Sequence, residues 1–269
     1  MFMSAAAELA ARAAILARAG EREGAGWALY RAATVVDGVD AAATAAYLDQ
    51  ALATVAGLPC PRLRGSIALL AAELAHDADD AAAGAAASVA AERYFQAAAD
   101  ARGFLAVWTA RALRALRHGD ADLGVAMVRW MLPWLDQIGE LAPRLWLRLF
   151  GAEALLADGR TDAATQWLLD VLELAPAGGG ERVIAAELLV RGLVAVGRRD
   201  DAVAIALTEL AIVRAPPGLR ARLYQTVATT IAAVDPELAR ACAELVAELD
   251  RAGAPPPATR KTIVSPLLA

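Results

Sequence analysis

The feature that most constrains this chain is a pair of amphipathic helices that meet at a very short turn within residues 144–176. The apolar pattern predicts helices over about 145–158 and 161–175, with Gly159 in the turn between them. Glycine readily adopts the left-handed backbone conformation that stops a helix. Two helices joined by so few residues pack side by side, so this segment predicts a helical hairpin.

Small and large apolar residues recur at fixed distances from the turn glycine. Ala164 lies five residues after Gly159, and Leu168 lies nine after it. Ala152 lies seven residues before it, on the first helix. A small residue at a crossing lets two helices approach closely, and a large one fills the space beside the contact. Pro176 then closes the second helix, because proline cannot continue it.

This spacing resembles the tetratricopeptide repeat, with its small residue in the first helix, turn glycine, alanine and large apolar residue in the second helix, and closing proline. The resemblance implies an all-α, right-handed α-solenoid of stacked hairpins with a binding groove. It also implies a non-catalytic adaptor or scaffold that binds another protein or peptide without a cofactor. Family members that grip a C-terminal carboxylate use Lys and Asn; this chain has no Asn and one Lys, which argues against that subtype.

Two further segments match the pattern. Trp27 lies eleven residues before Gly38, and Tyr47 lies nine residues after it. In the second segment, Trp108 lies eleven residues before Gly119. The resemblance therefore covers several copies and extends over roughly residues 24–251.

The distance between successive turns differs from that of the family. Gly119 and Gly159 are 40 residues apart, and Gly159 and Gly197 are 38 apart, whereas the family repeat has about 34 residues. Longer helices or loops such as 177–180 would absorb the difference, and a HEAT-like or irregular α-stack remains an alternative. Pro133 falls inside a predicted helix, where we expect a kink or an early break.

The periodic segments together predict an N-terminal capping helix and five to six hairpins, forming a repeat domain over 1–251. The capping helix is expected at about 4–19, and the hairpin helices at about 25–36, 40–56, 63–76, 79–98, 101–117, 121–137, 145–158, 161–175, 182–196, 200–214, 218–233 and 236–251. Residues 252–269 are expected to form a separate tail.

Composition indicates close-packed helices outside a membrane. Hydrophobic residues make up 58% of the chain but aromatic residues only 5%, because alanine, the best helix former, supplies the excess. There is no run of about 18 uncharged apolar residues that would span a bilayer. No basic segment precedes an apolar run at the N-terminus, so we expect the cytoplasm rather than secretion. The bias toward arginine and alanine is typical of high-GC bacterial coding.

Charge and cysteine usage favour a reduced protein that does not bind nucleic acid. The formal net charge is −5, and the basic residues are scattered singly rather than clustered as a nucleic-acid footprint requires. Cys60 and Cys242 have no metal or redox spacing, so both are expected to be ordinary reduced thiols.

No residue set predicts a metal or catalytic centre. His76 and His118 each end a helix, where a histidine interacts well with the last carbonyl groups. The acidic turns that follow them lack the ligand spacing of a calcium loop, so their aspartates are expected to cap helices. There is no nucleophile elbow, P-loop, dinucleotide fingerprint or zinc motif. An all-α enzyme is therefore the least favoured hypothesis.

Aromatic residues concentrate in two adjacent hairpins. They are Phe104, Trp108, Trp130, Trp134, Trp146, Phe150 and Trp167. Packing in a core of small residues is the favoured interpretation, and an aromatic binding groove is the alternative, because Trp and Met are over-used at binding surfaces. A closed pocket of these residues would favour a sensor that holds a small ligand.

The resemblance also implies which residues line the groove, since first helices form the concave surface in this family. The predicted groove residues are Thr109, Leu113, Trp146, Leu149, Glu153, Glu187 and Arg191.

The last 18 residues differ from the rest of the chain. Pro255-Pro256-Pro257 cannot be helical and predicts a semi-rigid spacer. The spacer is followed by basic residues and then by a β-branched and apolar cluster, a layout similar to C-terminal docking peptides of cargo proteins. The predicted docking residues are Arg260, Lys261, Ile263, Val264, Leu267 and Leu268. A tail without a role, or one that folds back onto the last helix, is the alternative.

Overall fold

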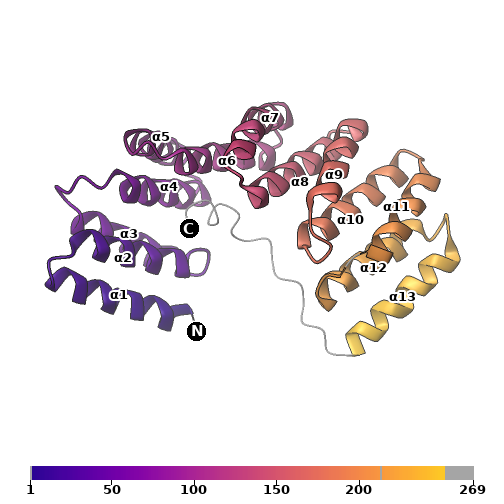
Figure 1. Ribbon diagram of the computed structural model, residues 1–269, viewed down its shortest axis with the longest axis horizontal. Helices are drawn as coiled ribbons and strands as arrows, with labels where there is room; N and C mark the ends of the chain where they lie inside the picture. Colours follow the sequence, from indigo (N-terminus) through magenta and orange to yellow (C-terminus); the bar gives the residue numbers. More distant parts are fainter. Residues whose placement is uncertain (1, 213, 252–269) are drawn as a thin grey trace. The chain divides into compact units, whose positions relative to one another are not determined.

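The computed structural model describes residues 2–212 and 214–251, apart from the side chain of Asp250, and this part of the chain is all-α (Figure 1). Thirteen helices and no strand occur in it. Their bounds are α1 Phe2–Arg18, α2 Arg22–Val36, α3 Ala41–Thr54, α4 Pro61–Asp77, α5 Ala81–Ala97, α6 Ala101–Arg117, α7 Ala121–Gln137, α8 Leu141–Ala157, α9 Thr161–Leu174, α10 Gly180–Ala195, α11 Arg199–Ile212, α12 Pro217–Ile231 and α13 Pro236–Arg251. The tail predicted over 252–269 lies outside the described residues.

The helices form two compact units, and the division falls within α6, between Ala110 and Arg111. In the first unit α1 packs on α2, as the predicted capping helix should, and α2 through α5 then pack on one another in chain order. An additional contact joins α2 to α4. Each helix thus rests mainly on its sequence neighbours, which is the contact pattern of a solenoid.

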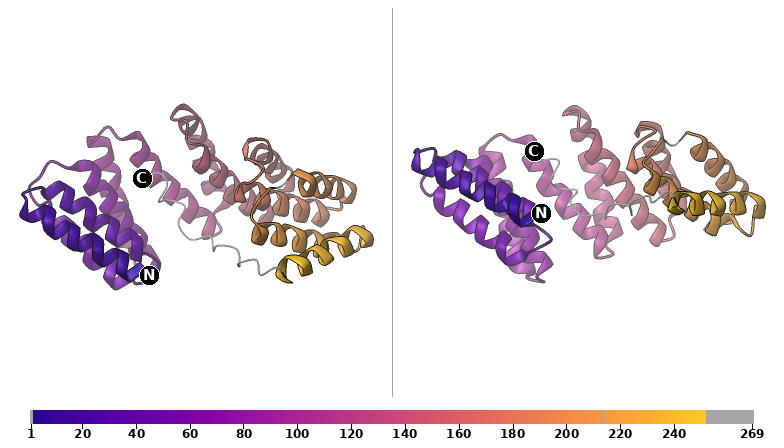
Figure 2. Two further views of the ribbon diagram at one scale, coloured as in Figure 1. Left: turned by 60° about the horizontal axis from the view of Figure 1, so that its bottom comes forward. Right: turned by 90° about the horizontal axis from the view of Figure 1, so that it is seen from below.

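The second unit has two layers of helices (Figure 2). In one layer α8 contacts α10, and α10 contacts α12. The other layer contains α9, α11 and α13, each packed on the helix before it. Helices α9 and α11 also contact α10 and α12, respectively, in the opposite layer. We call α8, α10 and α12 the first-helix layer, since each is the first helix of its hairpin. The fold is therefore an all-α helical-repeat solenoid.

A 20-residue period runs through the middle of the chain. Helices α4 to α8 each contain 17 residues and are separated by three-residue connections. One residue in each connection has a left-handed backbone conformation. These residues are Asp79, Ala99, Gly119, Gly139 and Gly159. Each turn thus ends one helix in the same way, and the hairpin repeat here is 40 residues rather than 34.

Aspartate caps start several helices at the same 20-residue spacing. The side chains of Asp80, Asp100 and Asp120 each accept a hydrogen bond from the backbone N–H three residues later, at 2.9–3.1 Å. Asp40 caps α3 in the same way at 2.9 Å. A cap satisfies a backbone donor that the first turn of a helix leaves without a partner. The acidic turns therefore have the capping role that the sequence predicted.

Glycines within helices mark the places where helices approach most closely. Phe95 is fully buried, and its ring lies about 3 Å or less from where a Cβ would stand on Gly65 of α4 or Gly103 of α6. The ring of Trp167 lies 2.0 Å from the corresponding point on Gly151 of α8. Any larger residue at these glycines would displace the ring, so these crossings depend on a missing side chain.

The predicted helix bounds agree with the structure to within about four residues, and those of α6 and α7 agree fully. The largest difference is at α8, which begins at Leu141 rather than near 145 and includes Pro143 in its first turn, where proline is tolerated. The early break expected at Pro133 does not occur, because α7 continues to Gln137. Pro133 is on the exposed side of α7, where water can reach the carbonyl that has lost its amide donor.

The alanines after the turns are expected to be intolerant of large side chains. Ala164 and Ala202 are both completely buried, so Ala164→Arg or Ala202→Arg should lower the free energy of unfolding by more than about 3 kcal/mol, through overpacking and burial of a charge. Chemical denaturation measures this loss. The control is Ala204→Arg at an exposed position of α11, which should change stability little; equal effects of all three variants would contradict the packing described here.

Candidate functional site

The exposed side of α8 carries an aromatic pair. Trp146 and Phe150 are one helical turn apart, and their ring centroids lie 6.0 Å apart with the planes tilted by 31°. Both side chains are half-buried, as is Glu153 in the next turn. The opposite side of α8 is buried and includes Gly151, against which Trp167 of α9 packs. The pair therefore lies on the surface of the first-helix layer.

The same arrangement occurs in the first unit, at the start of α6. Phe104 and Trp108 are also one turn apart, with ring centroids 6.3 Å apart and planes tilted by 46°, and both are half-buried. Side chains four residues apart in a helix are neighbours on one face. Each unit thus presents two adjacent aromatic side chains with tilted rings on a first helix, which the sequence shows as aromatic residues at positions i and i+4.

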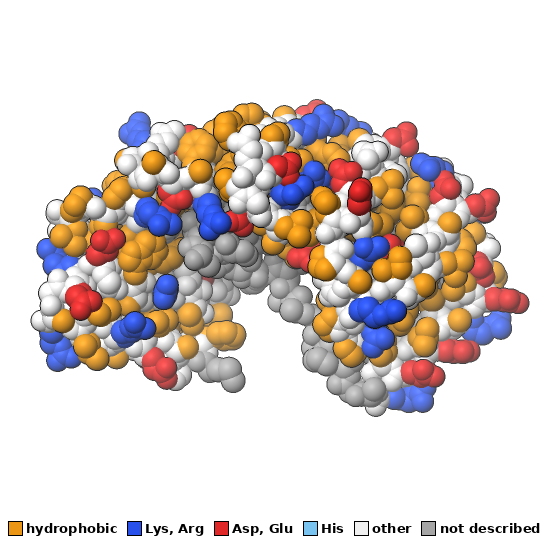
Figure 3. All heavy atoms as spheres, in the orientation of Figure 1, with side chains coloured by type: hydrophobic (Ala, Val, Ile, Leu, Met, Phe, Trp, Pro, Cys, Tyr) orange, Lys and Arg blue, Asp and Glu red, His pale blue; other side chains and the backbone are white. Residues whose placement is uncertain are grey.

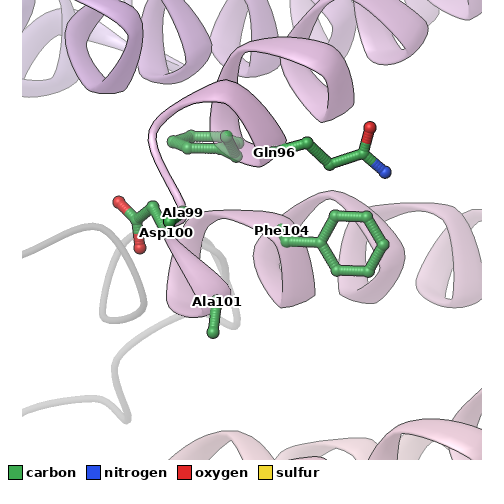
Figure 4. Close-up of a pocket in the computed structure, with 6 residues that line it drawn as sticks. Gln96, Ala99, Asp100, Ala101 and Phe104 are labelled. Carbon is green, nitrogen blue, oxygen red and sulfur yellow. The ribbon is translucent and has the colours of Figure 1, made fainter.

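An open hollow of about 320 Å³ lies at the turn between α5 and α6, next to Phe104 (Figure 4). Asp100 lines it, but its carboxylate points away from the ring of Phe104. One oxygen of Asp100 caps α6 through Gly103, and the other accepts a hydrogen bond from Arg62 at 2.7 Å. Structural contacts thus occupy both oxygens, and no predicted tryptophan lines this hollow.

The seven predicted groove residues differ in how deeply they are buried. Four are in the interior: Thr109, Leu113, Leu149 and Glu187. Trp146 and Glu153 are half-buried, and Arg191 is exposed near the end of α10. Thr109 follows Trp108, and one residue turns a helix by about 100°, so the predicted surface was rotated around α6. Phe104, Trp108 and Phe150, which the sequence placed in the aromatic cluster and not among the seven groove residues, are half-buried on the first helices.

Glu187 has a structural partner in the second unit. Arg222 of α12 donates to one of its carboxylate oxygens from two nitrogens, at 2.9 and 2.8 Å. The Glu187 side chain is only 2% exposed, because α10 is buried continuously from Val183 to Val190. Reversing this charge would place a buried positive charge against Arg222, which is 30% exposed, rather than change a groove.

A second buried ion pair fixes the start of α10. Arg182 donates two hydrogen bonds to the carboxylate of Glu209 on α11, at 2.6 and 2.8 Å. It also donates to the carbonyl oxygens of Leu172 and Ala175 at the end of α9, at 2.6 and 3.2 Å. One guanidinium therefore joins three helices, and it satisfies carbonyls that the end of α9 leaves without helical donors.

The aromatic residues of the predicted cluster divide into buried and exposed sets in the second unit. Trp167 is buried under Arg129, whose guanidinium lies 5.9 Å from the ring centroid. Met131 is fully buried, whereas Trp130 and Trp134 on the same helix are exposed. Packing thus accounts for Trp167, as the favoured interpretation held, but not for the two exposed tryptophans of α7.

The histidines and cysteines have local environments that explain them. His76 lies in the last turn of α4, and its ring fills the space above Gly84; His118 is exposed after the end of α6. Both Cys60 and Cys242 are buried free thiols. Burial raises the pKa of the Cys242 thiol, so little of it is thiolate at neutral pH. Within residues 2–212 and 214–251, no three His, Cys, Asp or Glu residues are placed to hold a metal ion.

Charged side chains are dispersed over the surface that Figure 3 displays, with basic and acidic groups side by side. This face has no continuous basic area of the kind that binds nucleic acid. No helix in the described residues is both long and apolar enough to cross a membrane.

No protein-family model and no curated protein matches this sequence. Among solved structures, the chain is similar to the crystal structure of the TPR domain of P58(IPK), with 17% sequence identity. The match covers 92% of this chain and 80% of that one, with a TM-score of 0.26. The fold assignment rests on the helix packing described above and not on this likeness.

The ion pair between Arg182 and Glu209 is expected to be worth more to stability than a surface pair. The side chains are 12% and 3% exposed, so Arg182→Leu leaves a buried carboxylate without its partner and should cost about 3–5 kcal/mol. The double variant Arg182→Leu/Glu209→Leu should recover much of this loss. Arg198→Leu, which breaks an exposed pair with Asp201, should cost less than about 1 kcal/mol. Urea denaturation of the four chains measures the differences, and an Arg182→Leu loss no larger than that of Arg198→Leu would contradict this assignment.

Proposed function

We propose that this protein is a helical-repeat adaptor that binds another protein through the first-helix layer of its second unit. The observation that carries the proposal is the half-buried pair of Trp146 and Phe150, whose rings lie next to each other on the surface of α8. In a chain with only 5% aromatic residues, two adjacent aromatic side chains that remain partly accessible are an unusual use of large side chains. Tryptophan is among the residues that contribute most to binding energy in protein interfaces.

The chemistry of this surface fits an apolar segment of a partner chain. The two ring centroids are 6.0 Å apart, so the rings together could contact about two residues of an extended partner segment. Covering an aromatic side chain contributes to binding through both the buried area and the ring contacts. Glu153 lies one turn beyond Phe150 on α8, and Arg191 is exposed on the adjacent α10. A partner segment with apolar side chains and a charged group at its end would match this surface.

The tail is proposed to be a second contact with a partner. It lies outside the described residues, so the support comes from its sequence, a proline spacer followed by Ile263, Val264, Leu267 and Leu268. A spacer of polyproline geometry extends about 3.1 Å per residue, which would hold the apolar cluster away from α13. We further propose that the protein acts in a reducing compartment such as the cytoplasm, which is supported by its two free thiols.

Replacing the aromatic pair should remove partner binding without unfolding the protein. Trp146→Ala/Phe150→Ala deletes two half-buried rings. The amount of a partner protein that immobilised variant captures should therefore be at least about tenfold lower than the amount that immobilised wild-type chain captures, as expected when binding hot spots are truncated. Quantitative mass spectrometry of proteins captured from cells of the source organism measures the ratio.

The matched control for this experiment is Leu169→Ala/Leu174→Ala, which removes two exposed apolar side chains from α9. It should leave capture unchanged. Thermal unfolding followed by circular dichroism confirms that both double variants fold. Capture of the same proteins in the same amounts by all three chains would contradict a partner site on α8.

Removing the tail should leave stability unchanged and weaken recruitment. A chain that ends at Arg251 keeps all thirteen described helices, so its melting temperature should match that of the full chain within a degree or two, while a partner that uses the tail should be lost. A drop of several degrees, or aggregation, would indicate instead that the tail covers the last helix. That result would remove the docking hypothesis for the tail.

A further inference from the structure

Helix α7 exposes a row of large apolar side chains. Leu123, Trp130 and Trp134 are 48%, 44% and 49% exposed, respectively, and Met127 is half-buried between them. The two indole rings are neighbours, with centroids 6.3 Å apart and planes tilted by 50°. We call these four residues the α7 stripe. No other helix described in the second unit exposes more than two large apolar residues, so this stripe needs an explanation.

The charged residues of α7 are directed away from the stripe. The helix has three of them, and each contacts a residue of α8, of α9 or of the turn between those helices. The contacts are Asp122 with Arg160 at 2.5 Å, Arg129 over the ring of Trp167 at 5.9 Å, and Asp136 with Arg144 at 2.6 Å. Residues 122, 129 and 136 repeat every seven positions and so share one side of the helix. The side that carries the stripe is therefore uncharged.

The corresponding helix of the next hairpin lacks such a stripe. The 40-residue repeat relates the four stripe positions to Ala163, Trp167, Asp170 and Leu174 of α9. There, Trp167 is buried against α8 and Asp170 is ion-paired with Arg148. Only two of the four equivalent positions on α9 hold large apolar residues, so the repeat architecture does not require a complete apolar row there.

We propose that the α7 stripe is a self-association surface, which binds the α7 stripe of a second copy of this chain across a two-fold axis with the helices antiparallel. The pairing does not depend on the partner site proposed on α8, because it uses the side chains of another helix. It predicts that the protein is a dimer at sufficient concentration.

The spacing of the stripe fits this symmetric pairing. Its residues are separated by four, three and four positions, which is the alternation that keeps one side of a helix facing a partner helix. The spacing is the same in both directions, so a two-fold axis beside Val128 and Arg129 places Leu123 opposite Trp134 of the second copy, and Met127 opposite its Trp130. Each indole then meets a smaller, flexible side chain. A parallel pairing would place indole on indole.

Charge favours a second copy over a charged partner, and area limits the strength of the pairing. The two tryptophans alone leave on the order of 200 Å² exposed, since a tryptophan side chain can bury up to about 250 Å². A stable interface buries about 800 Å² per partner, so the stripe would form its apolar centre and the pairing would be of moderate strength. Copies of a chain with a net charge of −5 repel one another over most surfaces, and an uncharged side of a helix avoids this repulsion.

Sedimentation velocity of the full-length chain over a range of concentrations tests the proposal. The wild-type chain should convert from monomer to dimer as concentration rises. Trp130→Gln/Trp134→Gln should raise the dissociation constant at least about tenfold, whereas Leu207→Gln, at a residue of α11 that is 51% exposed, should leave it unchanged. Circular dichroism establishes that each variant is folded.

Single cysteine variants test the antiparallel arrangement. With a rise of 1.5 Å per residue, the two copies of position 127 would be about 4.5 Å apart along the helix axes, and the two copies of position 123 about 16 Å apart. A short bis-maleimide should therefore join Met127→Cys into dimers but not Leu123→Cys. The negative control is the parent chain without an introduced cysteine, because its own two cysteines are buried.

Three results would overturn the proposal. The first is a wild-type chain that stays monomeric at every concentration, which would assign the stripe to a different protein. The second is a dimer that the tryptophan substitutions do not weaken. The third is equal cross-linking at positions 123 and 127, which would indicate a parallel pairing. None of these results bears on partner capture by Trp146 and Phe150, so the two proposals fail separately.

Discussion

The close approach of neighbouring helices is the constraint on which the rest of this structure depends. A chain so rich in alanine has few large side chains to fill space, so its helices pack closely at positions with little or no side chain. Phe95 occupies the space left by Gly65 and Gly103, and Trp167 occupies the space left by Gly151. The crossing at Gly151 sets the positions of α8 and α9, and through them the direction in which Trp146 and Phe150 face. The candidate binding surface is therefore a consequence of packing on the opposite side of the same helix.

Buried charge adds a second kind of constraint in the second unit. Helix α10 is buried on nearly all sides, yet Arg182 and Glu187 lie on it and form ion pairs with α11 and α12. An apolar contact tolerates small rotations of one helix against another. An arginine that donates from two nitrogens to one carboxylate restricts the two helices to a narrower range of angles. The pairs thus hold successive hairpins at defined angles, which a binding surface built from separate helices requires.

Much of the fold could be predicted from the sequence, because helix periodicity and turn chemistry are local. Gly119, Gly159 and Gly197 identified three turns, and the aspartates identified caps. The 20-residue period was harder to detect, since Asp79 and Ala99 occupy two of its turns in place of glycine. The candidate site was predicted less well, because the side of a helix that is exposed depends on its neighbours. Thr109 and Leu149 were expected on the surface and are buried, whereas Phe150, for which packing was the favoured interpretation, is half-buried beside Trp146. Glu187 looked like a surface acid because nothing local to it reveals Arg222, 35 residues away.

The free energy of unfolding of the first unit could be raised at the two turns that lack glycine. Asp79 and Ala99 have φ angles of 58° and 50°, a conformation that costs a residue with a Cβ about 1–2 kcal/mol relative to its usual one. Glycine has no such cost, and it occupies the equivalent position in the three turns that follow. The chain thus tolerates a strained backbone at two of five equivalent places. For an engineer, these turns are the places where a more heat-resistant variant could be sought without altering any surface proposed to bind a partner.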